Sequence, residues 1–133
     1  MIEEGESSGR DQIYKHTLNI INESPIFGAY YVIPYGLQQG SYPHNFFLEA
    51  FLATGVVGGV LYVCLVFYSI YKCYNLIKQD HGSSWILLLY LQMICFGMFS
   101  TGLYSSQDFW ILLFFVFSIN LTKRTQYNRI YNN

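Results

Sequence analysis

His44 is the residue whose type and position are best suited to chemistry in this sequence. It lies between Pro43 and Asn45, just before the first long apolar run of the chain. An imidazole titrates near neutral pH, so it can accept a proton from an attacking hydroxyl group or donate a hydrogen bond to a leaving phosphate. Two interpretations follow: a catalytic base, or an interfacial histidine that hydrogen-bonds to lipid headgroups.

Two charged residues could act beside His44. Arg10 carries a fixed positive charge and a planar fork of donors suited to a pyrophosphate, although in the first turn of a helix it equally suits contact with water. Glu49 follows His44 by five residues and precedes the uncharged run by two. It either faces His44 at the edge of the membrane or anchors the end of a helix there.

Metal and nucleic-acid sites are not predicted. No C-x-x-C motif occurs, and the histidines His16 and His81 have no partner at metal-ligand spacing, so we expect both to face water. The net charge of -1, without clustered lysines and arginines, does not suit a nucleic-acid partner. The three cysteines lie in or beside apolar stretches and are predicted to be buried free thiols: Cys64, Cys73 and Cys95.

The elements that must position these residues are predicted to be membrane helices. The chain has 133 residues, of which 53% are hydrophobic and 11% charged, against roughly 25% charged residues in soluble proteins. Three apolar runs without a charge follow one another: Phe51–Tyr71, Trp85–Tyr104 and the shorter Phe109–Leu121. The first would form a helix about 31 Å long, which matches a hydrocarbon core of roughly 30 Å. We therefore predict an all-α membrane protein with three transmembrane helices, at about residues 46–71, 85–104 and 107–124.

The first 45 residues are predicted to be an external segment with one short amphipathic helix. Ser8 to Asp11 has the form of a capping box, and apolar or small residues then recur at helical spacing, which predicts a helix from Gly9 to Glu23. Pro25 stops that helix, and Gly28 completes a turn. The aromatic loop 30–42 suits either a membrane interface or a glycan.

Loop lysines and arginines predict the orientation, because they collect on the cytoplasmic side. One face of a three-span protein carries five of them and the other carries only Arg10 and Lys15. The C-terminal tail is therefore expected to be cytoplasmic, and residues 1–45 and the turn 103–108 external, which in a bacterium means periplasmic. No signal peptide precedes the external segment, so we expect an earlier membrane span upstream, in a larger protein of which this chain is the C-terminal part.

Gly55 and Gly59 form a G-x-x-x-G pattern within the first apolar run. Such a pattern permits the close approach of another helix backbone. The predicted role is helix packing, not catalysis.

The order of the motifs carries a family resemblance. Along the chain come Ser8-Gly9-Arg10, a short helix, Ser24-Pro25-Ile26-Phe27-Gly28, an aromatic loop, Pro43-His44-Asn45-Phe46-Phe47-Leu48, and Thr54-Gly55-Val56-Val57-Gly58. This order resembles the O-antigen ligase and O-antigen polymerase family of bacterial envelope glycosyltransferases, closely over about residues 8–75.

The resemblance implies a multispanning inner-membrane enzyme that moves glycan from an undecaprenyl diphosphate carrier to a glycan or lipid acceptor hydroxyl at the periplasmic face. It implies no metal or nucleotide-sugar cofactor, and partners that include the membrane and the remaining transmembrane helices of a longer protein. Arg10 would steady the diphosphate and His44 would act as the general base or orient the acceptor. Asn45 and Glu49 are further candidates for substrate binding. Ala53 stands where many members carry a glutamate, which favours a polymerase over a ligase.

An alternative from another class is a small three-span membrane protein with a structural or partner-binding role and no catalysis of its own. Its Gly55/Gly59 face would then dock against a neighbour. A transporter of lipid-linked glycan is disfavoured, because no charged residues within the apolar runs line a path.

Overall fold

The fold is helical throughout the part of the chain that the structure describes. This structure, a computed structural model, describes residues 9–36 and 38–131, with side chains through residue 119. Over these residues the predicted all-α class is confirmed. The elements are four α-helices and one short 3₁₀ helix: α1 (Gly9–Glu23), α2 (Phe46–Gln79), η1 (His81–Ser83), α3 (Ser84–Gly97) and α4 (Gln107–Tyr131).

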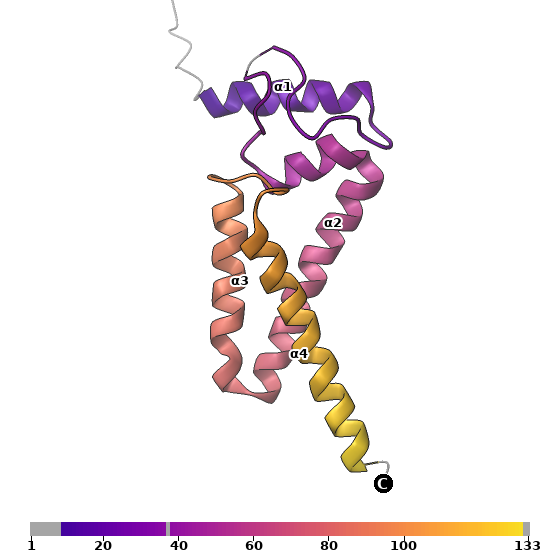
Figure 1. Ribbon diagram of the computed structural model, residues 1–133, viewed down its shortest axis with the longest axis vertical. Helices are drawn as coiled ribbons and strands as arrows, with labels where there is room; N and C mark the ends of the chain where they lie inside the picture. The colour runs from indigo at the N-terminus through magenta and orange to yellow at the C-terminus, as the bar shows by residue number, and fades with distance from the viewer. Residues whose placement is uncertain (1–8, 37, 132–133) are drawn as a thin grey trace, which may run out of the picture.

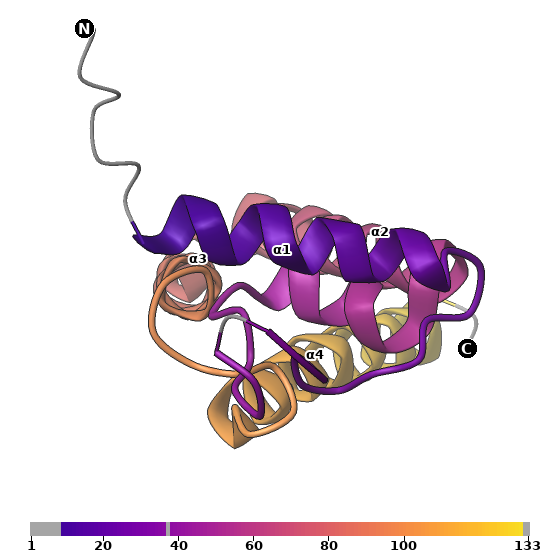
Figure 2. The ribbon, with the colours of Figure 1, turned by 90° about the horizontal axis from the view of Figure 1, so that it is seen from above.

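Helix α1 lies across one end of the bundle that α2, α3 and α4 form (Figure 1). Seen from above, it covers the beginning of α2 (Figure 2). The loop 24–45 and the turn 98–106 between α3 and α4 lie at this same end, and η1 lies at the opposite end (Figure 1). We call the end formed by α1, the loop 24–45, residues 46–54 and the turn 98–106 the cap.

Helix α1 has the bounds that the sequence predicts. Its buried residues are Ile13, Thr17, Ile20 and Ile21, which recur at helical spacing on one face. This face packs on Ile33 of the loop and Leu52 of α2. The helix ends at Glu23, two residues before Pro25, as expected. The predicted cap on Ser8 falls outside the described residues.

Helix α2 is broken at Gly55, which has φ 64° and ψ -162°. Only glycine adopts this conformation readily, because a Cβ atom would collide with the backbone. The nearest neighbours of Gly55 and Gly59 among the described residues are a turn and a side chain, not another helix, and packing of a further helix there stays a prediction. A Cβ on Gly55 would lie 2.4 Å from the carbonyl of Ile26, and one on Gly59 would meet the ring of Phe51, on its own helix, at 2.4 Å.

The largest apolar cluster joins α2, α3 and α4 and begins within the cap. Its buried residues are Phe46, Ala50, Tyr62, Val66, Tyr90, Phe109 and Leu113. The ring of Phe46 lies against Gly97, where an added Cβ would come within 2.2 Å of it. The last residue of α3 is thus packed against the first residue of α2, and this contact joins the bundle to the cap.

The three predicted membrane spans are not confirmed. Helix α2 has 34 residues and is the one helix among the described residues long and apolar enough to cross a membrane. It extends through most of the predicted connector 72–84, whereas α3 ends at Gly97 instead of continuing to Tyr104. The apolar part of α4 within the described side chains is Gln107–Ile119, which is too short by itself.

All three cysteines are free, as predicted, but only one of them is buried. Cys73 is buried, but Cys64 and Cys95 are exposed on the outer faces of their helices. Large apolar side chains are also exposed there, among them Phe67, Leu88 and Phe114. An outer surface of this kind suits contact with lipid or with other apolar helices.

Candidate functional site

Glu49 ties the beginning of α2 to the turn between α3 and α4. Its side chain is 4% exposed, and its Oε2 accepts a hydrogen bond of 2.6 Å from the backbone N–H of Leu103. The carbonyl of Leu103 in turn accepts a hydrogen bond of 3.0 Å from the indole N–H of Trp110. The Oε1 atom of Glu49 has no hydrogen-bond partner among the described residues. Glu49 is therefore a buried group that holds the first turn of α2 to the turn 98–106.

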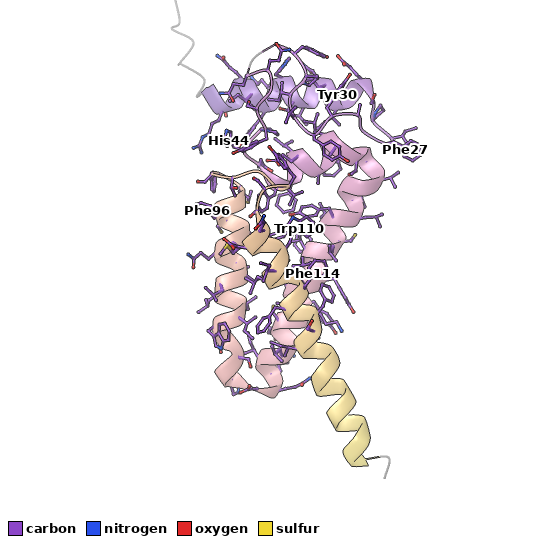
Figure 3. All side chains as sticks on the ribbon, in the orientation of Figure 1. Phe27, Tyr30, His44, Phe96, Trp110 and Phe114 are labelled. Carbon is purple, nitrogen blue, oxygen red and sulfur yellow. The ribbon has the colours of Figure 1, made fainter. Side chains whose placement is uncertain are left out.

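His44 reaches the same turn through an aromatic contact. It has a left-handed backbone, with φ 53°, which is uncommon outside glycine. Its ring lies 4.6 Å from that of Tyr42, and the Tyr42 ring lies 6.0 Å from that of Tyr104 in the turn. The side chain is half-buried, so it can be reached from outside. Figure 3 shows His44 in the cap, on the same side as Phe96 near the end of α3.

Arg10 lies over the same turn from the start of α1. Its guanidinium carbon is 5.9 Å from the centroid of the Phe99 ring, a cation–π contact. The side chain is exposed and keeps its donors open. Arg10, His44 and Glu49 thus each connect to the turn 98–106, although they come from three separate segments of the chain.

Asn45 is the N-cap of α2. Its Oδ1 accepts hydrogen bonds from the backbone N–H groups of Phe47 at 3.0 Å and Leu48 at 3.2 Å. Two otherwise free donors of the first helical turn are satisfied in this way. The oxygen of Asn45 is therefore engaged in the fold, and its role in binding a substrate stays a prediction.

The turn 25–28 docks on the break in α2. The carbonyl of Pro25 accepts from the N–H of Val56 at 2.7 Å, and that of Ile26 accepts from the N–H of Val57 at 3.4 Å. In return, the carbonyl of Leu52 accepts from the backbone N–H groups of Ala29 and Tyr30, at 3.3 and 3.4 Å. The turn thus supplies backbone partners that the interrupted helix lacks.

Glycine is needed on both sides of this contact. A Cβ on Gly28, whose φ is 65°, would lie 2.6 Å from backbone atoms of Ala53, Thr54 and Gly55. The segments Pro25–Gly28 and Thr54-Gly55 therefore form the two sides of one backbone contact. This contact fixes the loop 24–45, which carries His44.

A cavity of about 300 Å³ lies between the first turns of α2, the loop 24–45 and the turn 98–106. We call it the Glu49 pocket. The residues that line it are Tyr31, Glu49, Ala50, Ala53, Thr54, Gly58, Tyr62, Leu103, Tyr104 and Trp110. Sequence reasoning identified Glu49 but missed the aromatic walls, because Tyr31, Tyr62 and Trp110 come from three distant segments. Figure 3 labels Trp110 near the start of α4.

Elsewhere in the cap, Tyr35 donates a hydrogen bond to the carboxylate of Glu23. This bond is the main reason that the pKa of Tyr35 rises to about 12. The backbone carbonyl of Tyr35 lies 2.8 Å from the Nε2 of His16. His16 is therefore half-buried against the loop and does not simply face water. Within the described residues, no group of three or more His, Cys, Asp and Glu could hold a metal ion.

Residues 1–63 match the family described as O-antigen ligase. No curated protein and no solved structure matches the chain. The matched segment contains α1, the loop 24–45 and the first part of α2, and with them all four candidate residues: Arg10, His44, Asn45 and Glu49.

Proposed function

We propose that this chain, whose residues 1–63 match the O-antigen ligase family, takes part in transferring glycan from an undecaprenyl diphosphate carrier to an acceptor hydroxyl group. The family match over this segment agrees with the resemblance predicted from the motif order. The structural observation that supports the proposal is that Arg10 and Glu49 contact the turn 98–106, while His44 is linked to it through the ring of Tyr42. The cap would be the place of transfer, at the external face of the inner membrane.

In the proposed reaction, the acceptor hydroxyl oxygen attacks the anomeric carbon of the donor sugar. A new carbon–oxygen bond forms, and the bond from that carbon to the diphosphate breaks, with its electron pair leaving on the diphosphate. The hydroxyl proton passes to the imidazole of His44. The open guanidinium of Arg10 stabilises the negative charge on the departing diphosphate. No metal ion or nucleotide sugar enters this scheme.

The surroundings of His44 fix its backbone and leave its imidazole accessible to a substrate, as a catalytic base requires. Its left-handed backbone is a strained conformation of the kind that clusters at functional sites. The neighbouring Pro43 is buried, and the ring of Tyr42 contacts the imidazole from one side. None of the hydrogen bonds among the described residues occupies the imidazole, which leaves its nitrogens open to a substrate.

The test replaces His44 with alanine in cells that make the protein, with His81→Ala as the matched control. His81 is exposed and is the first residue of η1, at the end of the bundle away from the cap. We expect His44→Ala to lower the amount of polymerised or ligated envelope glycan by roughly 10²–10⁴-fold, the contribution of a general base. His81→Ala should leave it unchanged, and both variants should be as abundant in the membrane as the wild type.

A normal amount of glycan in the His44→Ala cells would refute the catalytic role of His44. It would favour the alternative of a membrane protein that acts by binding a partner.

A further inference from the structure

The Glu49 pocket contains a buried carboxylate oxygen that the fold leaves without a partner. Glu49 is 4% exposed, and among the described residues only its Oε2 is hydrogen-bonded, to the N–H of Leu103. An unsatisfied buried acceptor destabilises a fold, and more so when it is charged, so native structures contain few of them. The Oε1 atom therefore lacks a donor that a bound molecule could supply.

The pocket can be entered from outside. Tyr31 is 72% exposed and Tyr104 is 60% exposed, and both line the cavity that Glu49 borders. The volume of about 300 Å³ lies at the lower end of the roughly 300–1,000 Å³ typical of small-molecule pockets. Such a space suits one ring of a ligand, not a whole lipid or peptide.

The walls of the pocket are aromatic and partly fixed. The indole N–H of Trp110 donates to the carbonyl of Leu103, which holds the Trp110 ring in place. The Tyr62 and Trp110 rings lie 6.5 Å apart, in a tilted pair. Apolar walls with one well-placed polar group are the usual composition of a small-molecule site.

We propose that the Glu49 pocket binds one pyranose ring of a glycan. The C–H face of the ring would pack on the aromatic walls, and a ring hydroxyl would donate a hydrogen bond to Glu49 Oε1. A sugar satisfies both the apolar walls and the carboxylate, whereas a prenyl chain would satisfy the walls and leave Oε1 unpaired. That the natural ligand is the transferred or accepting glycan rests on the proposed function.

The test measures binding of sugars to the full chain in detergent micelles. The probes are the methyl glycosides of glucose, galactose and N-acetylglucosamine, detected by saturation-transfer NMR. A second readout is the fluorescence of Trp110 in a Trp85→Phe background, because the chain has only these two tryptophans. We expect at least one glycoside to bind and to alter the Trp110 fluorescence.

Two variants test the pocket itself. Glu49→Gln keeps an oxygen that can accept from Leu103 but loses the charge, so we expect binding about 5–10-fold weaker, the difference between charged and neutral hydrogen bonds. Ala53→Leu adds bulk to a residue that lines the cavity, so it should abolish binding. Glu23→Gln makes the same chemical change outside the pocket and should bind as the wild type does. Circular dichroism of each variant checks that the fold is kept.

Three outcomes would overturn the assignment: no binding of any glycoside, equal binding by all variants, or displacement of the glycoside by a short prenol such as farnesol. The pocket and the proposed function fail separately. If glycosides bind but His44→Ala cells make normal glycan, the pocket stands and the function falls. If His44→Ala abolishes the glycan and no glycoside binds, only the pocket falls.

Discussion

The contact between the turn 25–28 and the break in α2 makes a quantitative prediction for Gly28→Ala. A Cβ at this position would lie 2.6 Å from three backbone atoms of α2, and backbone cannot move aside as a flexible side chain can. Gly40 provides the matched control. It also has a positive φ, of 81°, but an added Cβ there meets nothing within 4 Å. Both variants therefore place an alanine on a left-handed backbone, but only Gly28→Ala also brings its Cβ into collision with the backbone of α2.

The expected magnitudes follow from these two terms. A left-handed backbone costs a non-glycine residue roughly 1–2 kcal/mol, so Gly40→Ala should lower the free energy of unfolding by about that amount. Gly28→Ala adds the loss of the docked contact, whose four backbone hydrogen bonds contribute roughly 0.5–1.5 kcal/mol each. We expect Gly28→Ala to cost about 3–8 kcal/mol in total. Gly55→Ala should cost as much, because its conformation is almost restricted to glycine.

The assay is reversible unfolding of the full chain in mixed micelles by a graded denaturing detergent, followed by far-ultraviolet circular dichroism. The free energy of unfolding is compared among wild type, Gly40→Ala and Gly28→Ala. If Gly28→Ala is no less stable than Gly40→Ala, the turn does not dock on the break in α2, and the reasoning is refuted.

Three further predictions concern the cap. Replacing Asn45 with alanine removes the N-cap of α2 and should lower the free energy of unfolding by roughly 1 kcal/mol. Asn45→Asp should keep the cap and the stability, so equal losses in the two variants would contradict the capping role. The pKa of Tyr35, raised to about 12 by its bond to Glu23, predicts that this bond stabilises the fold below pH 10 and is lost as the pH rises through about 12. Difference ultraviolet titration against Tyr35→Phe measures that pKa, and Glu23→Gln should lower it towards 10; an unchanged titration would count against the bond. Arg10→Gln should raise the donor concentration needed for half-maximal glycan transfer. It should not lower stability, because the contact of Arg10 with Phe99 is exposed. An unchanged donor dependence would show that Arg10 does not bind the diphosphate.

Helix α1 was predictable from sequence because its signals are local. The spacing of Ile13, Thr17 and Ile20 encodes the buried face, and Pro25 encodes the stop. These signals lie within the helix or beside it, so no knowledge of distant segments is needed.

The break in α2 and the end of α3 were not predictable in the same way. Gly55 lies in a continuous apolar run, and its conformation becomes understandable only with the turn 25–28 docked against it. Likewise α3 stops at Gly97, where Phe46 packs, within a sequence that stays apolar beyond that point. A hydropathy pattern identifies the apolar run, but it does not detect the contact at Gly55 or the contact at Gly97.

The sequence suggests candidate site residues by their type, but it does not predict their geometry. His44 and Arg10 stood out because their chemistry suits proton transfer and a diphosphate. The burial of Glu49 was hidden, since its partner Leu103 is 54 residues away. The Glu49 pocket was hidden for the same reason, because its aromatic walls come from the loop 24–45, α2 and α4.

Glycan transfer at the cap is tested most directly in membrane vesicles from cells that make the protein, with radiolabelled undecaprenyl diphosphate glycan as donor. The quantity measured is the rate at which label leaves the lipid carrier and appears in acceptor-linked glycan, for wild type, His44→Ala and His81→Ala at equal abundance. We predict transfer by the wild type and by His81→Ala, and a rate for His44→Ala lower by roughly 10²-fold or more. Equal rates for all three would contradict the account.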